Sequence, residues 1–206
     1  LALADLSADG LQELEALASE HGAQAMALAT DVTDEEQVAA FFESVKKRFG
    51  RADVLINLPG LSKVAQIHEM ALADYQRILD VNLMGTFLCA KHFIPLVDPE
   101  RGGQILNMAS MASKRANPNA PVYCAAKAAV AMLSQGLALQ LKERNIRVST
   151  LNPGPTNTQG FWGDRPVPRD KFLSPGNVAQ VVRFILSQPP HVLVHEVAFE
   201  SFDFFK

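Results

Sequence analysis

Short apolar segments alternate with longer amphipathic segments along almost the whole sequence, and this alternation restricts the fold more than any other feature. Stretches with helical spacing of apolar residues separate runs of strand length at 1–4, 24–29, 53–57, 104–108, 146–151 and 191–199. Strands joined by helices form βαβ units, whose parallel strands are covered by helices on both faces. The sequence therefore predicts an α/β fold with a doubly wound parallel sheet, in a single domain over residues 1–206.

Polar residues at the starts of the expected helices indicate where each helix begins. Ser7 and Ser174 are typical N-cap residues, and Pro175 suits a first helical position. Thr33 and Glu36 have the spacing of a capping box, which predicts a helix over 33–49. Longer apolar stretches predict helices over 73–96 and 122–141.

Composition and charge exclude several classes of protein. Of 206 residues, 48% are hydrophobic and 20% are charged, and the formal net charge is −3. This mildly acidic chain has no basic run, so we expect no nucleic-acid partner. We find no uninterrupted apolar stretch of about 18 residues and expect no membrane partner. Two cysteines cannot form a disulfide framework, and the five histidines show no metal-ligand spacing, so we expect a cytoplasmic protein without a metal.

Three side chains with complementary chemistry follow the expected strand at 104–108. Ser110 lies just beyond the strand, and Tyr123 and Lys127 are four residues apart on a helix, hence on one face. An ammonium near a phenol favours the phenolate and lowers the pKa of the tyrosine. With a serine hydroxyl to hold the substrate oxygen, these groups could move a proton to or from an alcohol or carbonyl. A Tyr–Lys pair alone, however, is more typical of a solvated surface.

The surrounding segments change that interpretation. In order, they read Asp-Val-Thr-Asp at 31–34, Asp-Val-Leu-Ile-Asn at 53–57, Asp-Val-Asn-Leu at 80–83, Ile-Leu-Asn-Met-Ala-Ser at 105–110, Tyr-Cys-Ala-Ala-Lys-Ala-Ala-Val at 123–130 and Asn-Pro-Gly-Pro-Thr-Asn-Thr at 152–158. Together they resemble the short-chain dehydrogenase/reductase family, nicotinamide-dependent oxidoreductases with a Rossmann-type fold. The resemblance implies hydride transfer between the cofactor and a small secondary alcohol or its ketone.

The resemblance also implies a role for each residue of the site. Tyr123 would be the general acid/base, and Lys127 would lower its pKa and bind the nicotinamide ribose. Ser110 would hold the substrate oxygen, and Asn82 would anchor a water in a proton relay. Phe161 and Trp162 follow the last of the matching segments and point to an apolar substrate.

The expected cofactor is NAD rather than NADP. Asp5 follows the first strand, where a carboxylate accepts hydrogen bonds from the adenosine ribose and repels a 2′-phosphate, and Leu6 offers no cation for that phosphate. The alternative is that Asp5 only caps the following helix. The resemblance implies cofactor contacts from Asp5, Asp31, Val32, Asn57, Leu58, Gly60, Tyr123, Lys127, Pro153, Gly154, Thr156 and Thr158.

Two features depart from the family pattern. The family usually has Asn-Asn-Ala-Gly where this chain has Asn-Leu-Pro-Gly at 57–60, so an amide side chain and a backbone N–H are lost. No glycine-rich phosphate-binding segment precedes Asp5, and residue 1 corresponds to the family's second strand. We therefore expect the sequence to lack a first strand, loop and helix of about thirty residues, whose strand would lie between those at 1–5 and 53–57.

Two functions from different classes fit these observations. The first is an NAD-dependent oxidoreductase; the alternative is a non-catalytic relative that binds ligands or forms oligomers without a phosphate-binding loop. The presence of Ser110, Tyr123 and Lys127 together favours the enzyme. The helices at 73–96 and 122–142 are apolar around much of their circumference. In the family that the sequence resembles, the corresponding helices pair across a subunit interface, so the resemblance implies a homodimer or homotetramer, with burial inside one subunit as the alternative.

Overall fold

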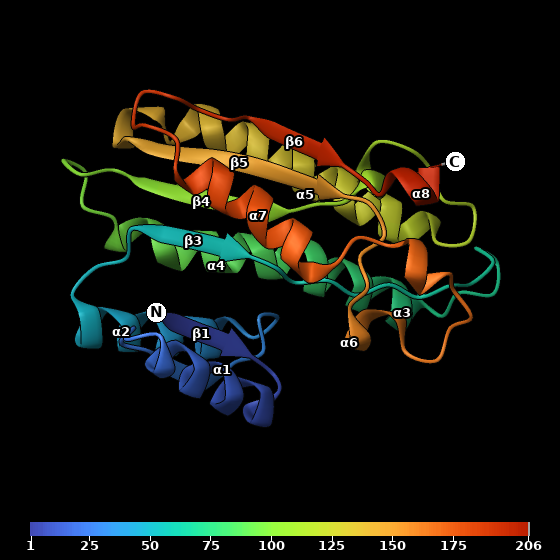
Figure 1. Cartoon of the computed structure of the whole chain (residues 1–206), viewed down its shortest axis with the longest axis horizontal. Helices are drawn as coiled ribbons and strands as arrows, with labels where there is room; N and C mark the ends of the chain where they lie inside the picture. Colours follow the sequence, from blue (N-terminus) through green and yellow to red (C-terminus); the bar gives the residue numbers. More distant parts are fainter. Residues whose placement is uncertain (206) are drawn as a thin grey trace.

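The computed structural model describes residues 1–205, apart from the side chain of Gln159, and contains two parallel sheets flanked by helices (Figure 1). One sheet has the order β1-β2 and the other β3-β4-β5-β6, and every pairing is parallel. The strands are β1 Ala2–Asp5, β2 Met26–Ala29, β3 Val54–Asn57, β4 Gly103–Met108, β5 Ile146–Pro153 and β6 Glu196–Phe199. The predicted α/β fold with parallel strands is confirmed.

The helices connect the strands in the predicted alternation. The longer ones are α1 Ala8–Glu20, α2 Glu35–Phe49, α3 Leu72–Leu79, α4 Gly85–Phe93, α5 Pro121–Gln140 and α7 Pro175–Leu186, and α6 Gln159–Trp162 and α8 Phe202–Phe205 are single turns. Short π or 3₁₀ segments are η1 Asp80–Met84, η2 Ile94–Leu96, η3 Met111–Ser113, η4 Lys142–Arg144 and η5 Arg169–Lys171.

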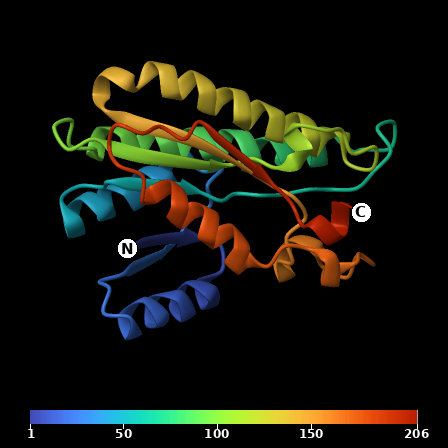
Figure 2. The same cartoon turned by 45° about the horizontal axis from the view of Figure 1, so that its top comes forward.

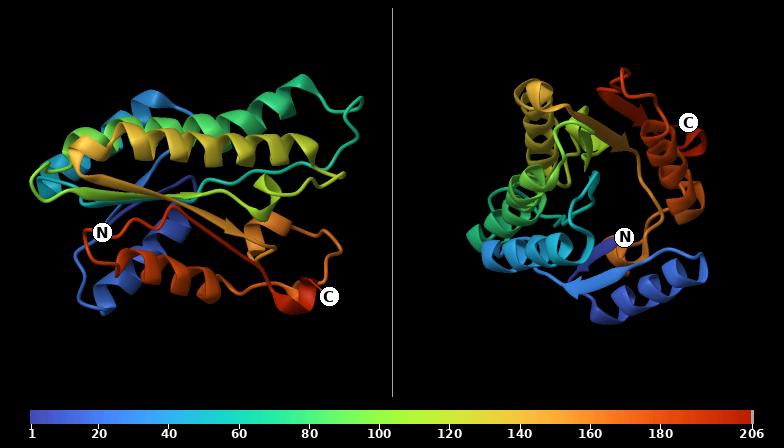
Figure 3. Two further views of the ribbon diagram at one scale, coloured as in Figure 1. Left: turned by 90° about the horizontal axis from the view of Figure 1, so that it is seen from above. Right: turned by 90° about the vertical axis from the view of Figure 1, so that its left-hand side faces the viewer.

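Helices cover the four-stranded sheet on both faces. In Figures 2 and 3, α2, α4 and α5 lie on one side of the sheets, and α1 and α7 lie on the other. Alternate residues of β4 face the two layers: Ile105 packs in the cluster with α2 and α4, whereas Leu106 packs with Ile185 of α7. β4 and β5 are thus buried on both faces, as continuous apolar strands predict, whereas Val54 and Ile56 of β3 are 44% and 38% exposed.

The two sheets are separate at one defined place. β1 and β3 each form an edge of their own sheet, and no ladder joins them in the described part of the chain. The parallel arrangement is therefore interrupted between β1 and β3.

Most of the expected helix starts are correct. The Ser7 hydroxyl accepts a hydrogen bond from Gly10 N, and Ser174 forms a capping box with Asn177. The capping box expected at Thr33 is wrong, because Asp34 is the N-cap and accepts from the next backbone N–H groups. The Thr33 hydroxyl instead donates to the carboxylate of Asp31.

The helix α5 bears on the expected absence of a membrane span. By length and composition alone, it is long enough and apolar enough to cross a membrane. The criterion of an uninterrupted apolar stretch does not identify it. In the fold, α5 lies against β4 and β5 and buries Ala126, Lys127 and Val130. A core helix can pass the same test, but 33% of this window is buried, so packing within the chain accounts for only part of its apolar composition.

Candidate active site

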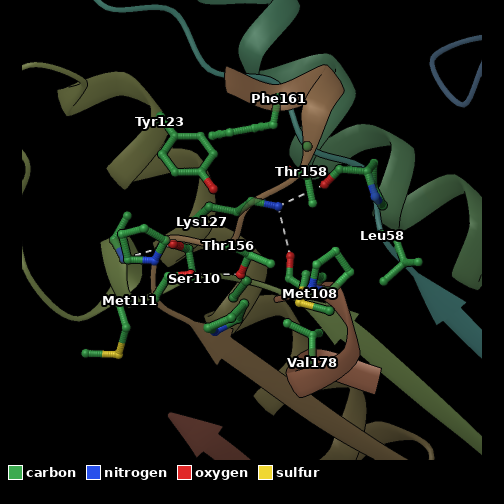
Figure 4. Close-up of a pocket in the computed structure, with 18 of the residues that line it drawn as sticks. Leu58, Met108, Ser110, Met111, Tyr123, Lys127, Thr156, Thr158, Phe161 and Val178 are labelled. Atoms are coloured by element: carbon green, nitrogen blue, oxygen red, sulfur yellow. Dashed lines mark hydrogen bonds between the residues drawn. The ribbon is translucent and has the colours of Figure 1, made fainter. Parts of the chain in front are cut away.

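A cavity of about 1050 Å³ opens beyond the carboxyl ends of the strands (Figure 4). Ligands of open parallel sheets bind at this edge. Ten of the predicted residues line the cavity: Asp5, Leu58, Gly60, Ser110, Tyr123, Lys127, Pro153, Gly154, Thr156 and Thr158. The other four, Asp31, Val32, Asn57 and Asn82, do not line it.

The predicted catalytic side chains come from two neighbouring elements. Ser110 follows β4 and caps η3, with its hydroxyl accepting from Ala112 N at 3.1 Å. Tyr123 and Lys127 are on consecutive turns of α5, and the Lys127 ammonium lies 5.9 Å from the centre of the Tyr123 ring. Figure 4 shows these side chains at one wall of the cavity. The structure therefore brings together the three groups that the motif predicts.

Lys127 is held from two sides although it is almost completely buried. Only 2% of its surface is exposed, and its Nζ donates to the carbonyl oxygens of Pro59 at 2.9 Å and Met108 at 2.8 Å. Burial without a carboxylate partner lowers the pKa of Lys127 to about 7. The ammonium has three protons. Two are donated to these backbone carbonyl oxygens, and the third remains available.

The expectation that Lys127 lowers the pKa of Tyr123 is wrong for this structure. Burial raises the pKa of the Tyr123 phenol, and the neighbouring Ser110 hydroxyl opposes that shift. The ammonium turns towards the two carbonyl oxygens, and its own lowered pKa reduces its charge at neutral pH. Desolvation, which depends on tertiary packing, therefore determines the direction of the shift in the pKa of Tyr123.

Asn82 lies below the cavity in a widened helical turn. Around it the chain forms the π segment η1, where Gly85 N donates to Asp80 O, between α3 and α4. The Asn82 side chain is fully buried, and its Nδ2 donates to the carbonyl oxygens of Leu61 and Ile78, each at 2.8 Å. Its Oδ1 has no hydrogen-bond partner within the described residues, which leaves a buried acceptor beside the site.

The loop after β5 is fixed by a close approach to β6. A Cβ atom on Gly154 would lie 2.5 Å from the Cβ of Glu200, so only glycine fits without a shift. Thr156 Oγ1 donates to Gly154 O at 3.1 Å, and Trp162 Nε1 donates to Thr156 O at 2.7 Å. This loop therefore presents Thr156 and Thr158 to the cavity on a constrained backbone.

At the opposite end of the cavity, Asp5 fits both readings that the sequence allows. Its Oδ1 accepts from Ser7 N at 2.8 Å in the turn leading to α1, which is the capping role. The residue is exposed and also lines the cavity, and no hydrogen bond is recorded for Oδ2 within residues 1–205. A carboxylate with one oxygen turned to a cavity can accept from ribose hydroxyls.

Asp31 and Asn57 are engaged by the protein itself. Asp31 Oδ1 accepts from Thr33 N and Oγ1, and these hydrogen bonds lower the pKa of its carboxyl. Asn57 is buried, and its Nδ2 donates to Asn107 Oδ1 at 2.9 Å. Val32 packs against Gly85, where a Cβ atom would lie 2.7 Å from Val32 Cγ2.

Several residues of the site were not predicted. Asn107 Nδ2 donates to Ser134 Oγ and so extends the buried polar chain from Asn57 to α5. Asn117 and Phe204 also line the cavity. Within residues 1–205, no group of three or more His, Cys, Asp or Glu side chains is placed to hold a metal ion.

Comparison with known proteins identifies the family. A sequence model of the short chain dehydrogenase family matches residues 1–166. An uncharacterised oxidoreductase of Staphylococcus saprophyticus is 34% identical over 171 residues, which cover 81% of this chain and 71% of the relative.

Solved structures agree with that relation. An alcohol dehydrogenase from the archaeon Thermococcus sibiricus, complexed with 5-hydroxy-NADP, has a TM-score of 0.90 and 29% identity, covering 98% of this chain and 86% of that one. An NAD⁺-bound xylitol dehydrogenase has a TM-score of 0.87 and 27% identity, covering 97% and 87%. The chain therefore belongs to the short-chain dehydrogenase/reductase family of Rossmann-fold oxidoreductases.

Proposed function

We propose that this chain interconverts a secondary alcohol and its ketone with a nicotinamide cofactor, and that Tyr123 is the general acid/base. One observation carries the proposal: Tyr123, Ser110 and Lys127 line one cavity, and the ammonium of Lys127 is buried at its wall. A buried ammonium without a carboxylate partner is costly for a fold, so a catalytic role explains its presence better than stability does.

Ser110 and Tyr123 have different roles in the proposed proton transfer. In ketone reduction, Ser110 donates a hydrogen bond to the substrate oxygen, and Tyr123 delivers a proton to it. The raised pKa of Tyr123 keeps the phenol protonated at neutral pH, as this direction requires. For the return of a proton to Tyr123, the unpartnered Oδ1 of Asn82 would anchor a water in a relay that includes Lys127.

The residues present fit a nicotinamide cofactor at both ends of the cavity. Asp5 would accept from the adenosine ribose, with Asp31, Val32, Asn57, Leu58 and Gly60 near the adenosine side. Lys127 has a third proton for the nicotinamide ribose, and residues 153–158 offer the hydroxyls of Thr156 and Thr158 to the carboxamide. When bound, the cofactor supplies or accepts the hydride.

NAD is the preferred cofactor in this proposal. The carboxylate of Asp5 lines the cavity, and Leu6 beside it is exposed and uncharged. A 2′-phosphate would meet like charge there and find no cation at the next position. The two similar structures contain an NADP derivative and NAD⁺ respectively, so the preference depends on Asp5 in this chain.

The outer face of the helix pair α4 and α5 favours a homo-oligomer. Phe87, Met132 and Leu139 are 48%, 65% and 80% exposed, and burying such side chains between subunits would stabilise a dimer or tetramer. We place this enzyme in the cytoplasm, with no nucleic-acid or membrane partner.

A direct test is an assay of NADH consumption with a panel of uncharged and charged ketones, together with calorimetric titration of NAD⁺ and NADH. We expect turnover of at least one ketone and binding of both cofactor forms. Absence of turnover across the panel, combined with absence of cofactor binding, would contradict the enzyme and favour the non-catalytic alternative.

A further inference from the structure

A row of aromatic rings extends from the catalytic tyrosine across one end of the cavity. The ring centres are 5.8 Å apart between Tyr123 and Phe161, and 5.2 Å apart between Phe161 and Trp162. The row continues to Phe172 at 4.9 Å and Phe204 at 5.5 Å. We call Phe161, Trp162, Phe172 and Phe204 the aromatic cap; all but Phe172 line the cavity.

Phe161 is the member of the cap that stands over the reacting groups. Its ring is tilted by 55° to that of Tyr123. On the other side, its Cε2 lies 4.0 Å from the position that a Cβ atom on Gly60 would take. Figure 4 shows Phe161 beside Tyr123. A substrate whose oxygen reaches Tyr123 and Ser110 therefore has to place its neighbouring group against this ring.

The cap is held in position by contacts that use its polar atoms. Trp162 Nε1 donates to Thr156 O at 2.7 Å. The guanidinium of Arg165 lies 5.3 Å from the centre of the Phe161 ring and 5.0 Å from that of Trp162, and Arg165 also donates to the carbonyl oxygens of both residues. With these groups occupied, the cap presents ring surface rather than donors to a substrate.

Two cations in the segment after Ser110 are already paired with carboxylates. Arg115 forms an ion pair with Glu200, and Lys114 pairs with Glu196 at 2.6 Å. Arg183 lines the cavity in the last turn of α7, eight residues or about 12 Å along the helix from its start at Pro175. A carboxylate or phosphate on the substrate would lose its water beside the apolar rings of the cap, and to bind Arg115 it would have to compete with Glu200.

We infer that the substrates are uncharged ketones with an aromatic ring next to the carbonyl, and that Phe161 selects this ring. This inference rests on the proposed function, in which the ketone gains a hydride from NADH at carbon and a proton from Tyr123 at oxygen. Tilted and offset contacts between aromatic rings are favourable beyond the area they bury. Phe161 therefore distinguishes a flat ring from a saturated ring of the same size.

The test compares three ketones of similar size with the unmodified protein: acetophenone, cyclohexyl methyl ketone and the carboxylate 4-acetylbenzoate. We expect kcat/KM for acetophenone to exceed that for the saturated ketone by about 5-fold and that for the carboxylate by more than 10-fold. Turnover of all three at similar rates, or a preference for the carboxylate, would overturn the inference while leaving the proposed function intact.

Substitution separates the ring from the volume that it fills. Phe161→Leu keeps an apolar side chain, so we expect kcat/KM for acetophenone to fall about 5-fold and that for cyclohexyl methyl ketone to change less than 2-fold. Phe184→Leu, which removes an exposed ring of α7 outside the cavity, is the matched control and should change neither. NADH binding and the thermal unfolding temperature of each variant verify folding.

Equal loss for both ketones in Phe161→Leu would show that the ring has no selective role and would contradict the inference. If none of these ketones is turned over but other carbonyls in the wider panel are, the inference about the substrate is wrong and the proposed function still holds. If no carbonyl is reduced and NADH does not bind, the proposed function fails with it.

Discussion

The two sheets of this molecule differ most in how deeply their strands are buried. Most residues of β4 and β5 are buried, whereas β1 and β2 contain no fully buried residue. The catalytic candidates follow β4 or lie on α5 beside β5, and the candidate for cofactor selection, Asp5, ends β1. The comparison suggests that proton transfer is built on rigid packing, and cofactor choice on strands that tolerate change.

The largest effect on activity should come from a substitution beside the buried strands β4 and β5. Tyr123→Phe removes the proton that the site delivers and keeps the ring, so we expect kcat to fall about 10³-fold while the affinity for NADH stays within 2-fold. Initial rates and calorimetry measure the two quantities. Retention of more than a tenth of the activity would remove Tyr123 from its role.

A matched pair of truncations tests the packing difference itself. Leu106 of β4 is 1% exposed and packs with Ile185, whereas Leu28 of β2 is 38% exposed. Leu106→Ala should lower the free energy of unfolding by about 3 kcal/mol and Leu28→Ala by about 1 kcal/mol. Denaturant titration of both variants gives the values, and equal losses would contradict the comparison.

The buried ammonium should make stability depend on pH. The pKa of Lys127 is about 7 in the folded chain against an ordinary value of 10.5, so the unfolded chain binds more protons between these values. The free energy of unfolding should therefore rise with pH across this window, by at most about 1.4 kcal/mol per pH unit. Subtracting the same titration of Lys127→Met isolates this contribution; an unchanged slope in that variant would contradict the assignment.

The smallest effect is expected from a substitution in the less buried sheet, at Asp5, which ends β1. Asp5→Ser removes the carboxylate that disfavours a 2′-phosphate, so the ratio of kcat/KM for NADH to that for NADPH should fall about 10-fold. The thermal unfolding temperature should barely change because Asp5 is exposed. Asp9→Ser, an exposed change in the first turn of α1, is the control. A ratio that falls equally in both variants would mean that Asp5 acts only through the helix.

Local patterns predicted most of the fold and the grouping of Ser110, Tyr123 and Lys127 at one cavity, because the strand and the helix that carry them are each encoded by neighbouring residues. The last strand was predicted too long, since Arg147 takes the carbonyl oxygens of Pro189 and Val192 and the ladder begins only at Glu196. A pattern of apolar residues contains no information about such a distant guanidinium.

The same limit explains what was missed in the site. The raised pKa of Tyr123 follows from burial, and the aromatic cap joins rings from residues 161–204 that no short motif connects. Asn107 sits inside an apolar strand, and its bonds to Asn57 and Ser134 depend on the pairing of strands and the approach of α5. Tertiary contacts, rather than composition, determine these features.

The widened turn at Asn82 has a consequence for protein engineering. A π turn contains one residue more than the α-helical turn it replaces, and each residue of a helix turns the chain by about 100°. Deleting one residue from 80–84 would restore a regular α turn and leave Leu88 and Phe93 facing the core they fill, but it would disrupt the turn that directs the Asn82 amide to the carbonyl oxygens of Leu61 and Ile78. Designers of shortened or recombined variants should therefore place their crossovers outside this turn.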